Sequence, residues 1–405
     1  MLVFSLSCKD VKGKGKDNQD EPDNSETELP KKGDATIKIF RGAPILFEPK
    51  DVPDGYHDPD ENGIIRLANG RLILKKLEGL PSYERDVKLT LKARLVSTGD
   101  DYDRSGSIFI LNKKKKGVSP IDVAKGENYP EMQGELNRYK GIIALDGYDP
   151  CVELMRFMTP FGVGYYSELP QLKPPAHVSA WEKDVKWQAD ISHLYSLLEG
   201  EAYIGVWIDT WAPAAAPNQY PKGGGWALDL TLKAEESNED KPRVEWKVAP
   251  LINTVPYIGQ NYPDVFGYLK QGVPVNPNIS RAKEAKLYYT TTGHGGYHGG
   301  DEFTKRENTI YLNKNKIKSW IPWKDNCRMV RKWNPASAVF QNGVASSDLD
   351  RSNWCPSDMV PPEVIPLDVE ELDSDSIFKF IVKNANKSQN GKTDFWLVSA
   401  YVVYR

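Results

Sequence analysis

Short stretches in which hydrophobic and polar residues alternate recur along most of the chain, and this pattern predicts β-strands. The clearest is at residues 87–95, where Val87, Leu89, Leu91, Ala93 and Leu95 fall on one face. Further strand patterns lie at 35–40, 107–111, 203–211, 226–232, 244–248, 286–291, 309–313, 377–382 and 395–404. Residues 191–198 predict one short helical turn that ends at Gly200.

The strand patterns form two blocks, separated by a polar stretch at 233–243. The 29 prolines and 32 glycines are spread between the strands as turns. Many short strands without helical periodicity predict an all-β protein made of two antiparallel β-sandwiches, for which jelly rolls are the expected type. We place the N-terminal domain at 34–235 and the C-terminal domain at 243–405.

The N-terminus has the features expected of an exported lipoprotein. Residues 1–7 are apolar or small and precede Cys8, so 1–8 resemble the end of a lipoprotein signal. The alternative is an unrelated N-terminal cysteine, because Ser5 and Leu6 differ from the residues usual before a lipidated cysteine. Residues 9–33 are almost devoid of apolar side chains and predict a disordered tether. The expected location is secreted, periplasmic or on the surface of a bacterium, with Cys8 as the candidate lipid anchor in the outer membrane.

Composition narrows the classes of ligand. A net charge of −3 provides no basic field, which argues against nucleic acid as a partner. The 11 Trp and 20 Tyr suit stacking on sugar rings, although most should lie in cores. Five histidines leave little material for a metal site with several His ligands.

The most unusual segment is the glycine-rich run GHGGYHGGDEF at 293–303. Glycine is unfavourable in strands but lets the backbone approach a ligand closely. His294, His298, Asp301 and Glu302 are candidate metal ligands, and a flexible loop with scattered polar groups is another alternative. We favour a loop that presents Glu302 to a substrate.

Three further motifs contain candidate site residues. Asp103 stands next to Arg104, whose charge favours an ionised carboxylate. Asp209 lies near the end of the predicted strand 203–211, on the same face as Tyr203 and Trp207. A carboxylate on an aromatic face is an arrangement suited to sugars. For the acidic motif around Asp103 the alternatives are a solvated loop and a calcium ligand set. For Asp209 the alternative is an edge strand with its polar side in water.

The third motif, RSNWCP at 351–356, places Arg351 and Trp354 beside Cys355. Cys327 is the natural disulfide partner of Cys355. Closing the loop between them would stabilise the fold by about 3–4 kcal/mol in the chain-entropy account.

In their order along the chain, these motifs resemble the peptide-N-glycosidase F family. The resemblance rests on Asp101–Arg104, Arg156–Pro160, Asp209–Trp211, Thr292–Gly296 with Gly300–Glu302, and Arg351–Pro356. It covers about residues 35–405 and is most specific in the C-terminal half.

The resemblance implies two eight-stranded antiparallel jelly rolls packed side by side, with the active site in the cleft between them. It implies no metal and no cofactor. The catalytic carboxylates would be Asp103, Glu302 and Asp209, although the family has Glu where this chain has Asp209. The matching cleft positions are Arg104, Trp211, His294, Arg351 and Trp354, and the family's disulfide corresponds to Cys327–Cys355.

The implied reaction is hydrolysis of the amide bond between the innermost GlcNAc and asparagine, which releases the glycan as a glycosylamine and leaves aspartate. N-glycosylated proteins and glycopeptides would be the partners of a monomeric enzyme. A non-catalytic glycan-binding surface protein is the main alternative. A copper-dependent oxygenase would need more histidines and a Met ligand, and an adhesin would not need the glycine-rich loop.

Overall fold

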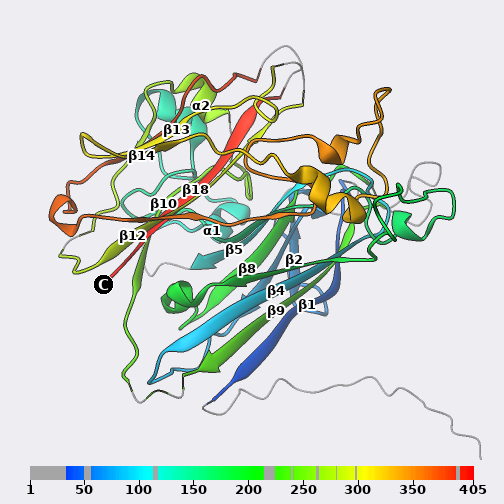
Figure 1. Ribbon diagram of the computed structural model, residues 1–405. Coiled ribbons are helices and arrows are strands. Elements are labelled where there is room, and N and C mark those ends of the chain that lie inside the picture. Colours follow the sequence, from blue (N-terminus) through cyan, green and yellow to red (C-terminus); the bar gives the residue numbers. More distant parts are fainter. Residues whose placement is uncertain are drawn as a thin grey trace, which may run out of the picture.

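The structure of the protein is a computed structural model that describes residues 33–49, 56–112, 117–213, 224–237, 239, 241–260, 264–279, 281–296, 299–388 and 393–405 (Figure 1). Cys8 and all but the last residue of the predicted tether lie outside the described residues. The fold is mostly β, as predicted. No helix in the described part of the chain is long and apolar enough to cross a membrane.

Two antiparallel sheets form the N-terminal half, which we define as residues 33–237. The first has the order β1-β9-β4-β7, with bounds Ala35–Ile45, Trp226–Glu236, Val87–Ser97 and Val185–Asp190. The second has the order β15-β6-β5-β8-β3-β2, with bounds Met359–Val360, Val152–Met158, Ser105–Asn112, Ala202–Ile208, Leu72–Leu77 and Ile64–Leu67. Its edge strand β15 comes from the C-terminal half.

The alternation predicted for residues 87–95 is confirmed in β4. Leu89, Leu91 and Leu95 have no exposed surface, and they pack with Ile204 and Val206 of β8 in one hydrophobic core. Burial of such side chains stabilises a sandwich by about 1.5–3 kcal/mol each. This core joins the two N-terminal sheets face to face.

The C-terminal half, residues 244–405, also has two antiparallel sheets. One has the order β10-β18-β12-β16, with bounds Lys247–Asn253, Phe395–Tyr404, Ala285–His294 and Glu363–Pro366. The other has the order β11-β17-β13-β14, with bounds Val273–Val275, Phe378–Val382, Asn308–Leu312 and Asn315–Trp320. Leu287, Ile310 and Phe380 belong to the core between them. The sheets are sandwich-like in both halves, whereas the jelly-roll connectivity and the domain boundaries stay predictions.

Helical elements are short throughout the described residues. The α-helices are α1 (Pro120–Ala124) and α2 (Val265–Tyr268). The 3-10 turns are η1 (Ala68–Gly70), η2 (Gly134–Tyr139), η3 (Tyr166–Glu168), η4 (Ser192–Leu197), η5 (Cys327–Trp333), η6 (Ser346–Asp348) and η7 (Val369–Glu371). The turn η4 confirms the predicted helical turn near 191–198.

A buried polar network joins the two halves. Arg156 of β6 is 1% exposed and binds Glu153 through two hydrogen bonds of 2.6 and 2.8 Å. Its Nη1 donates to Thr292 Oγ1 of β12 at 2.9 Å and to the carbonyl of Leu397 in β18 at 3.1 Å. Removing one partner of such a buried pair is strongly unfavourable, so this network fixes the C-terminal strands against β6.

An aromatic core lies on the other side of β8. Trp207, Phe109 and Tyr257 pack there, with the rings of Phe109 and Tyr257 stacked at 3.9 Å between centroids. The alternation predicted for residues 203–209 is therefore correct, because odd and even positions enter different cores. Trp207 is only 3% exposed, however. It fills the space between β8 and the C-terminal half, and the expectation that it contacts a sugar is corrected.

Candidate functional site

A pocket of about 600 Å³ lies where the loop after β4 meets the loop after β12. We call it the carboxylate pocket; its lining residues are Tyr102, Asp103, Phe161, Gly296, Gly299, Glu302, Phe303, Ala338, Phe340, Ser346, Leu349 and Arg351. The N-terminal half supplies Asp103, and the C-terminal half supplies Glu302 and Arg351. The predicted catalytic pair, separated by about half of the chain, thus shares one pocket.

The glycine-rich loop has a shape that other residues would not tolerate. Gly295 has φ +125, and a Cβ atom there would lie 2.3 Å from Asp394 Oδ1. The backbone N–H of Glu302 donates to the carbonyl of Gly295 at 3.3 Å, which closes the loop. Glycine therefore permits the turn that brings Glu302 into the pocket.

Arg351 connects the two carboxylates. Its guanidinium is 1% exposed, Nε donates to Glu302 Oε1 at 2.9 Å, and Nη2 lies 3.4 Å from Asp103 Oδ2. Nη1 donates to the carbonyl of Leu349 at 2.8 Å. Among the described residues Nη2 makes only long contacts, to Asp103 and to Ser346 Oγ at 3.4 Å. It is therefore the donor that a ligand oxygen could engage most easily.

The electrostatics of the pair favour protonation. Burial raises the pKa of Glu302 to about 7, with the neighbouring Asp103 adding to the shift and Arg351 opposing it. Burial also raises the pKa of Asp103, against the lowering effect of Arg351 and Arg104. Two carboxylates share one arginine, so one proton held between them relieves their repulsion. The pair can therefore give and take a proton near neutral pH.

Arg104 does not line the pocket and is bound to Asp100, a residue that the sequence did not single out. Nε and Nη2 of Arg104 donate to the two oxygens of Asp100 at 3.0 and 3.1 Å. Asp100 has no exposed surface, and Oδ2 also accepts from Thr210 Oγ1 at 2.6 Å and Trp226 Nε1 at 3.2 Å. Arg104 therefore acts as a fixed positive charge behind Asp103 rather than as a lining residue.

Asp209 belongs to a second cluster, which is linked to the pocket through Arg104, a residue that interacts electrostatically with both Asp209 and Asp103. Arg71 Nη1 lies 3.4 Å from Asp209 Oδ1, and the guanidinium stacks over the ring of Trp211 at 4.4 Å. Phe47 lies against Trp211 at 5.1 Å between ring centroids. Trp211 is 50% exposed, so this aromatic face is open to a ligand. Burial raises the pKa of Asp209, and the positive charges of Arg71 and Arg104 oppose this shift.

His294 and Trp354 lie behind the pocket, so the prediction that they contact the substrate is corrected. They are 6% and 3% exposed. The ring of His294 stacks between Trp354 and Phe395 at 5.5 and 4.9 Å. Its Nε2 lies 2.8 Å from Thr292 Oγ1, and burial lowers its pKa well below the usual value. Trp354 Nε1 donates to the carbonyl of Gly293 at 2.9 Å, so both residues support the glycine-rich loop.

The predicted disulfide is confirmed: Cys327 and Cys355 are joined at 2.06 Å, with 5.2 Å between their Cα atoms. It closes the segment that supplies Ser346, Leu349 and Arg351 to the pocket. Among the described residues no group of three or more His, Cys, Asp or Glu side chains is placed to hold a metal ion. His298, a candidate ligand, lies outside the described residues.

Comparisons with known proteins agree with this architecture. The family model for the N-terminal domain of peptide-N-glycosidase F matches residues 36–218, and the model for its C-terminal domain matches residues 261–403. No curated protein matches the chain.

Solved structures show the same similarity. The chain is 30% identical to PNGF-II with a TM-score of 0.78, and the match covers 92% of this chain and 65% of that one. The crystal structure of a peptide-N(4)-(N-acetyl-β-D-glucosaminyl) asparagine amidase matches at 17% identity, TM-score 0.57, over 92% and 96% of the two chains. PNGase F, a glycosylasparaginase from Flavobacterium meningosepticum, matches at 18% identity and TM-score 0.54 over the same shares. With two family models that together span most of its length, the chain belongs to the peptide-N-glycosidase F family.

Proposed function

We propose that the protein is a peptide-N-glycosidase that hydrolyses the amide bond between the innermost GlcNAc and asparagine of N-glycoproteins and glycopeptides. The observation that supports this most is the trio of Asp103, Arg351 and Glu302, in which one buried arginine contacts carboxylates from both halves of the chain. Solved relatives of this fold include a peptide-N(4)-(N-acetyl-β-D-glucosaminyl) asparagine amidase.

Amide hydrolysis needs an activated water, a polarised carbonyl and a proton for the departing nitrogen. In our proposal ionised Asp103 is the primary group, which accepts the proton of the attacking water or holds the amide. Glu302, with a pKa of about 7, positions the water and returns a proton to the leaving nitrogen. The water oxygen bonds to the amide carbon, the C–N bond breaks, and the protons of water are shared between the new carboxyl group and the released amine.

Arg351 would stabilise the oxyanion. Within the described part of the chain its Nη2 makes only contacts of 3.4 Å, so turning this donor toward a developing negative charge breaks no short hydrogen bond. A donor of this kind is typically worth about 10²–10³ in kcat. Arg104, bound to Asp100 through two hydrogen bonds, would act through its field on Asp103.

Asp209 is assigned a supporting catalytic role, through the cluster that it forms with Arg71 and Trp211. Because Asp209 is ion-paired to Arg71, we expect it to orient the exposed Trp211 ring rather than to move a proton. The sugar next to the scissile bond would lie on this ring, as flat apolar faces of sugars pack on indole.

The expected products are a peptide with aspartate in place of asparagine, and a glycosylamine that decays to free sugar and ammonia. We further propose a monomeric bacterial enzyme that is secreted or held on the outer membrane through Cys8. Mass spectrometry of Cys8 in the protein purified from its natural host would test the anchor.

The reaction itself is tested by incubating the protein with a denatured N-glycoprotein in heavy-oxygen water. The proposal predicts that the glycosylated asparagine becomes aspartate carrying one heavy oxygen. Binding of the glycoprotein without any conversion would instead identify a glycan-binding protein.

A further inference from the structure

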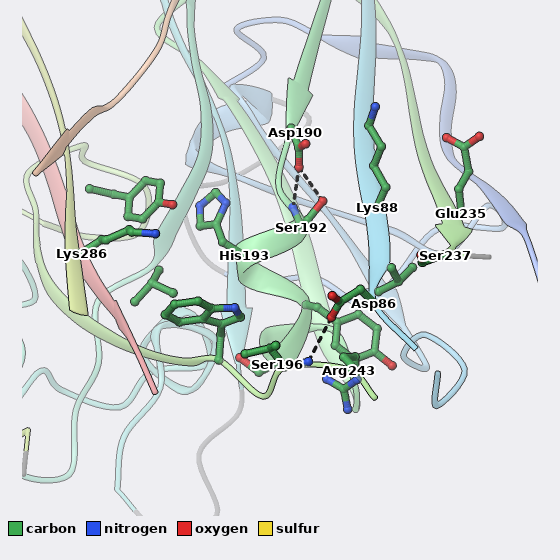
Figure 2. Close-up of a pocket in the computed structure, with 16 residues that line it drawn as sticks. Asp86, Lys88, Asp190, Ser192, His193, Ser196, Glu235, Ser237, Arg243 and Lys286 are labelled. Carbon is green, nitrogen blue, oxygen red and sulfur yellow. Dashed lines mark hydrogen bonds between the residues drawn. The ribbon is translucent and has the colours of Figure 1, made fainter. Parts of the chain in front are cut away.

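A second pocket, of about 630 Å³, lies beside the linker between the two halves, and no step of the proposed reaction uses it (Figure 2). We call it the linker pocket; its lining residues include Asp86, Lys88 and Ser237 of the N-terminal half, Arg243 of the linker, and Trp246, Lys286 and Tyr288 of the C-terminal half. Its volume falls within the about 300–1,000 Å³ typical of sites for small ligands.

The two pockets lie at opposite ends of the same strands. Strand β4 starts at the linker pocket with Val87 and ends at Ser97, just before the loop of Asp103; β12 likewise runs from the linker pocket at Lys286 to His294. These stretches of strand span about 26–34 Å at the usual rise per residue. In Figure 1 the start of β12 lies next to the C-terminus, away from its glycine-rich end. A ligand in the linker pocket therefore leaves the carboxylate pocket free.

The charges that line the linker pocket balance. Asp86, Asp190 and Glu235 are acidic, and Lys88, Arg243 and Lys286 are basic. His193 adds no charge near neutral pH, because burial lowers its pKa to about 4. A strongly anionic or cationic ligand would meet repulsion from half of these groups. The lining thus favours a neutral ligand.

Several polar groups around the pocket have hydrogen-bonding capacity left. Asp190 uses Oδ1 to bind the N–H and the hydroxyl of Ser192 at 2.9 and 2.5 Å, and Asp86 uses Oδ1 to bind the N–H of Val244 at 3.0 Å. Among the described residues, the second oxygen of each of these carboxylates has no hydrogen-bond partner. Figure 2 shows Lys88 and Asp190 on one side of the pocket and Lys286 on the other. Hydroxyl groups, which both donate and accept, match such a mixed set.

Aromatic rings supply a rigid apolar surface between these groups. Tyr288 stacks on His193 at 4.2 Å with 7° between their planes and on Tyr401 at 5.2 Å, and these two rings lie side by side with 6.0 Å between their centroids. His193 Nε2 also lies 3.0 Å from Tyr401 Oη, which fixes the imidazole. Trp246 is half-buried and lines the same pocket, with Lys286 Nζ at 5.5 Å and the Arg405 guanidinium at 5.4 Å from its ring centroid. Rigid rings bind a ligand at low entropic cost.

From this combination of aromatic faces, open hydrogen-bonding groups and balanced charge, we propose that the linker pocket is a second, non-catalytic binding site for a neutral oligosaccharide. The pyranose faces would pack on Trp246 and Tyr288, and the hydroxyls would bind Asp86, Asp190 and Lys88. The proposal stands independently of the amidase reaction, because it uses none of the residues in the carboxylate pocket.

The test is calorimetric titration of the full chain with a free oligomannose glycan, which lacks the scissile amide. We compare the wild type with two variants of the linker pocket: Trp246→Ala removes a ring from it, and Ser237→Tyr fills it. Trp211→Ala, outside the linker pocket, is the control. The first two variants should weaken binding at least tenfold, about 1.4 kcal/mol, and Trp211→Ala should retain the linker-pocket site. Hydrolysis of a short glycopeptide, if the wild type performs it, should stay unchanged in Trp246→Ala and Ser237→Tyr.

Four outcomes would overturn the proposal: no binding of any neutral glycan, binding that survives both pocket variants, loss of all binding in Trp211→Ala, or equally tight binding of a glycan-free peptide or a sialylated glycan. Because Ser237→Tyr removes no packing, its result remains informative if Trp246→Ala unfolds. Failure of glycan binding would leave the amidase proposal intact, and absence of amidase activity would leave this site intact.

Discussion

Replacing Arg351 with lysine perturbs the link between the two carboxylates while keeping the positive charge. Arginine contacts Glu302 at 2.9 Å, the carbonyl of Leu349 at 2.8 Å and Asp103 at 3.4 Å through three different nitrogens. Lysine presents all its donors on one nitrogen, so it cannot keep all three contacts. The two carboxylates and the carbonyl then compete for one ammonium group, and the separate donor assigned to the oxyanion is lost.

The magnitude follows from these contacts. Loss of one preorganised donor lowers kcat by about 10²–10³. Arg351 also opposes the raised pKa values of Asp103 and Glu302. With this opposition weakened, their pKa values rise further above the ordinary range, and the acid limb of the pH–rate profile moves to higher pH. The variant should therefore recover part of its activity in alkaline buffer.

The assay is kcat/KM for a fluorescent glycopeptide measured from acid to alkaline pH. Arg94 offers a matched control, because it also bridges two carboxylates, Asp184 at 2.7 Å and Asp229 at 3.0 Å, but on the surface. Arg94→Lys should leave rate and pH profile unchanged, since exposed pairs contribute only about 0–1 kcal/mol. An Arg351→Lys enzyme with near-normal kcat/KM and an unshifted profile would refute the assigned role of Arg351.

Three further predictions concern the support of the site. Asp100→Asn leaves Arg104 without its buried charged partner, so we expect urea denaturation to show a loss of about 3–5 kcal/mol in unfolding free energy. Asp184→Asn at the surface is the control, and an equal loss in both variants would contradict the argument. Replacing both Cys327 and Cys355 with serine should lower the unfolding free energy by about 3–4 kcal/mol, and an unchanged midpoint would show that the disulfide does not stabilise this segment. Treatment with EDTA should leave the amidase rate unchanged, whereas a loss that added metal restores would revive the metal interpretation of His294 and His298.

The raised pKa of Glu302 also affects stability. A carboxyl group with a folded-state pKa above its unfolded value binds its proton more tightly in the folded protein. Its contribution to stability is full below the unfolded value of about 4.5 and is lost as the pH rises through about 7. Ionised Glu302 therefore lowers the stability of the fold at neutral and alkaline pH.

Some strands were predictable from the sequence, among them β4, which buries one face, and β18, in which nine of ten residues are buried. Others, such as β6 and β7, were not. The period of two in β4 identified its core face correctly. In β6 all seven residues are buried, so no alternation marks the strand. The predicted strand at 244–248 starts only at Lys247, because Val244 is instead tied through its N–H to Asp86 at the linker.

The candidate site was predictable only in part. Asp103, Glu302 and Arg351 stood in short motifs, and the structure brings them together. Asp100 and Arg71 were missed because their roles depend on partners distant in sequence, such as Trp226 and Asp209. Alternation placed Trp207 on the correct face, but it gives no information about which part of the chain covers that face.

The central claim is that Asp103 takes part in hydrolysis of the glycosylated asparagine, and a comparison with Asp103→Asn tests it most directly. The two proteins should unfold at similar temperatures, because the substitution keeps the shape of the side chain. Mass spectrometry of a glycopeptide after incubation should show aspartate with the wild type and intact glycosylated asparagine with the variant. Full conversion by Asp103→Asn would contradict the account, and no conversion by the wild type with any glycopeptide would remove its basis.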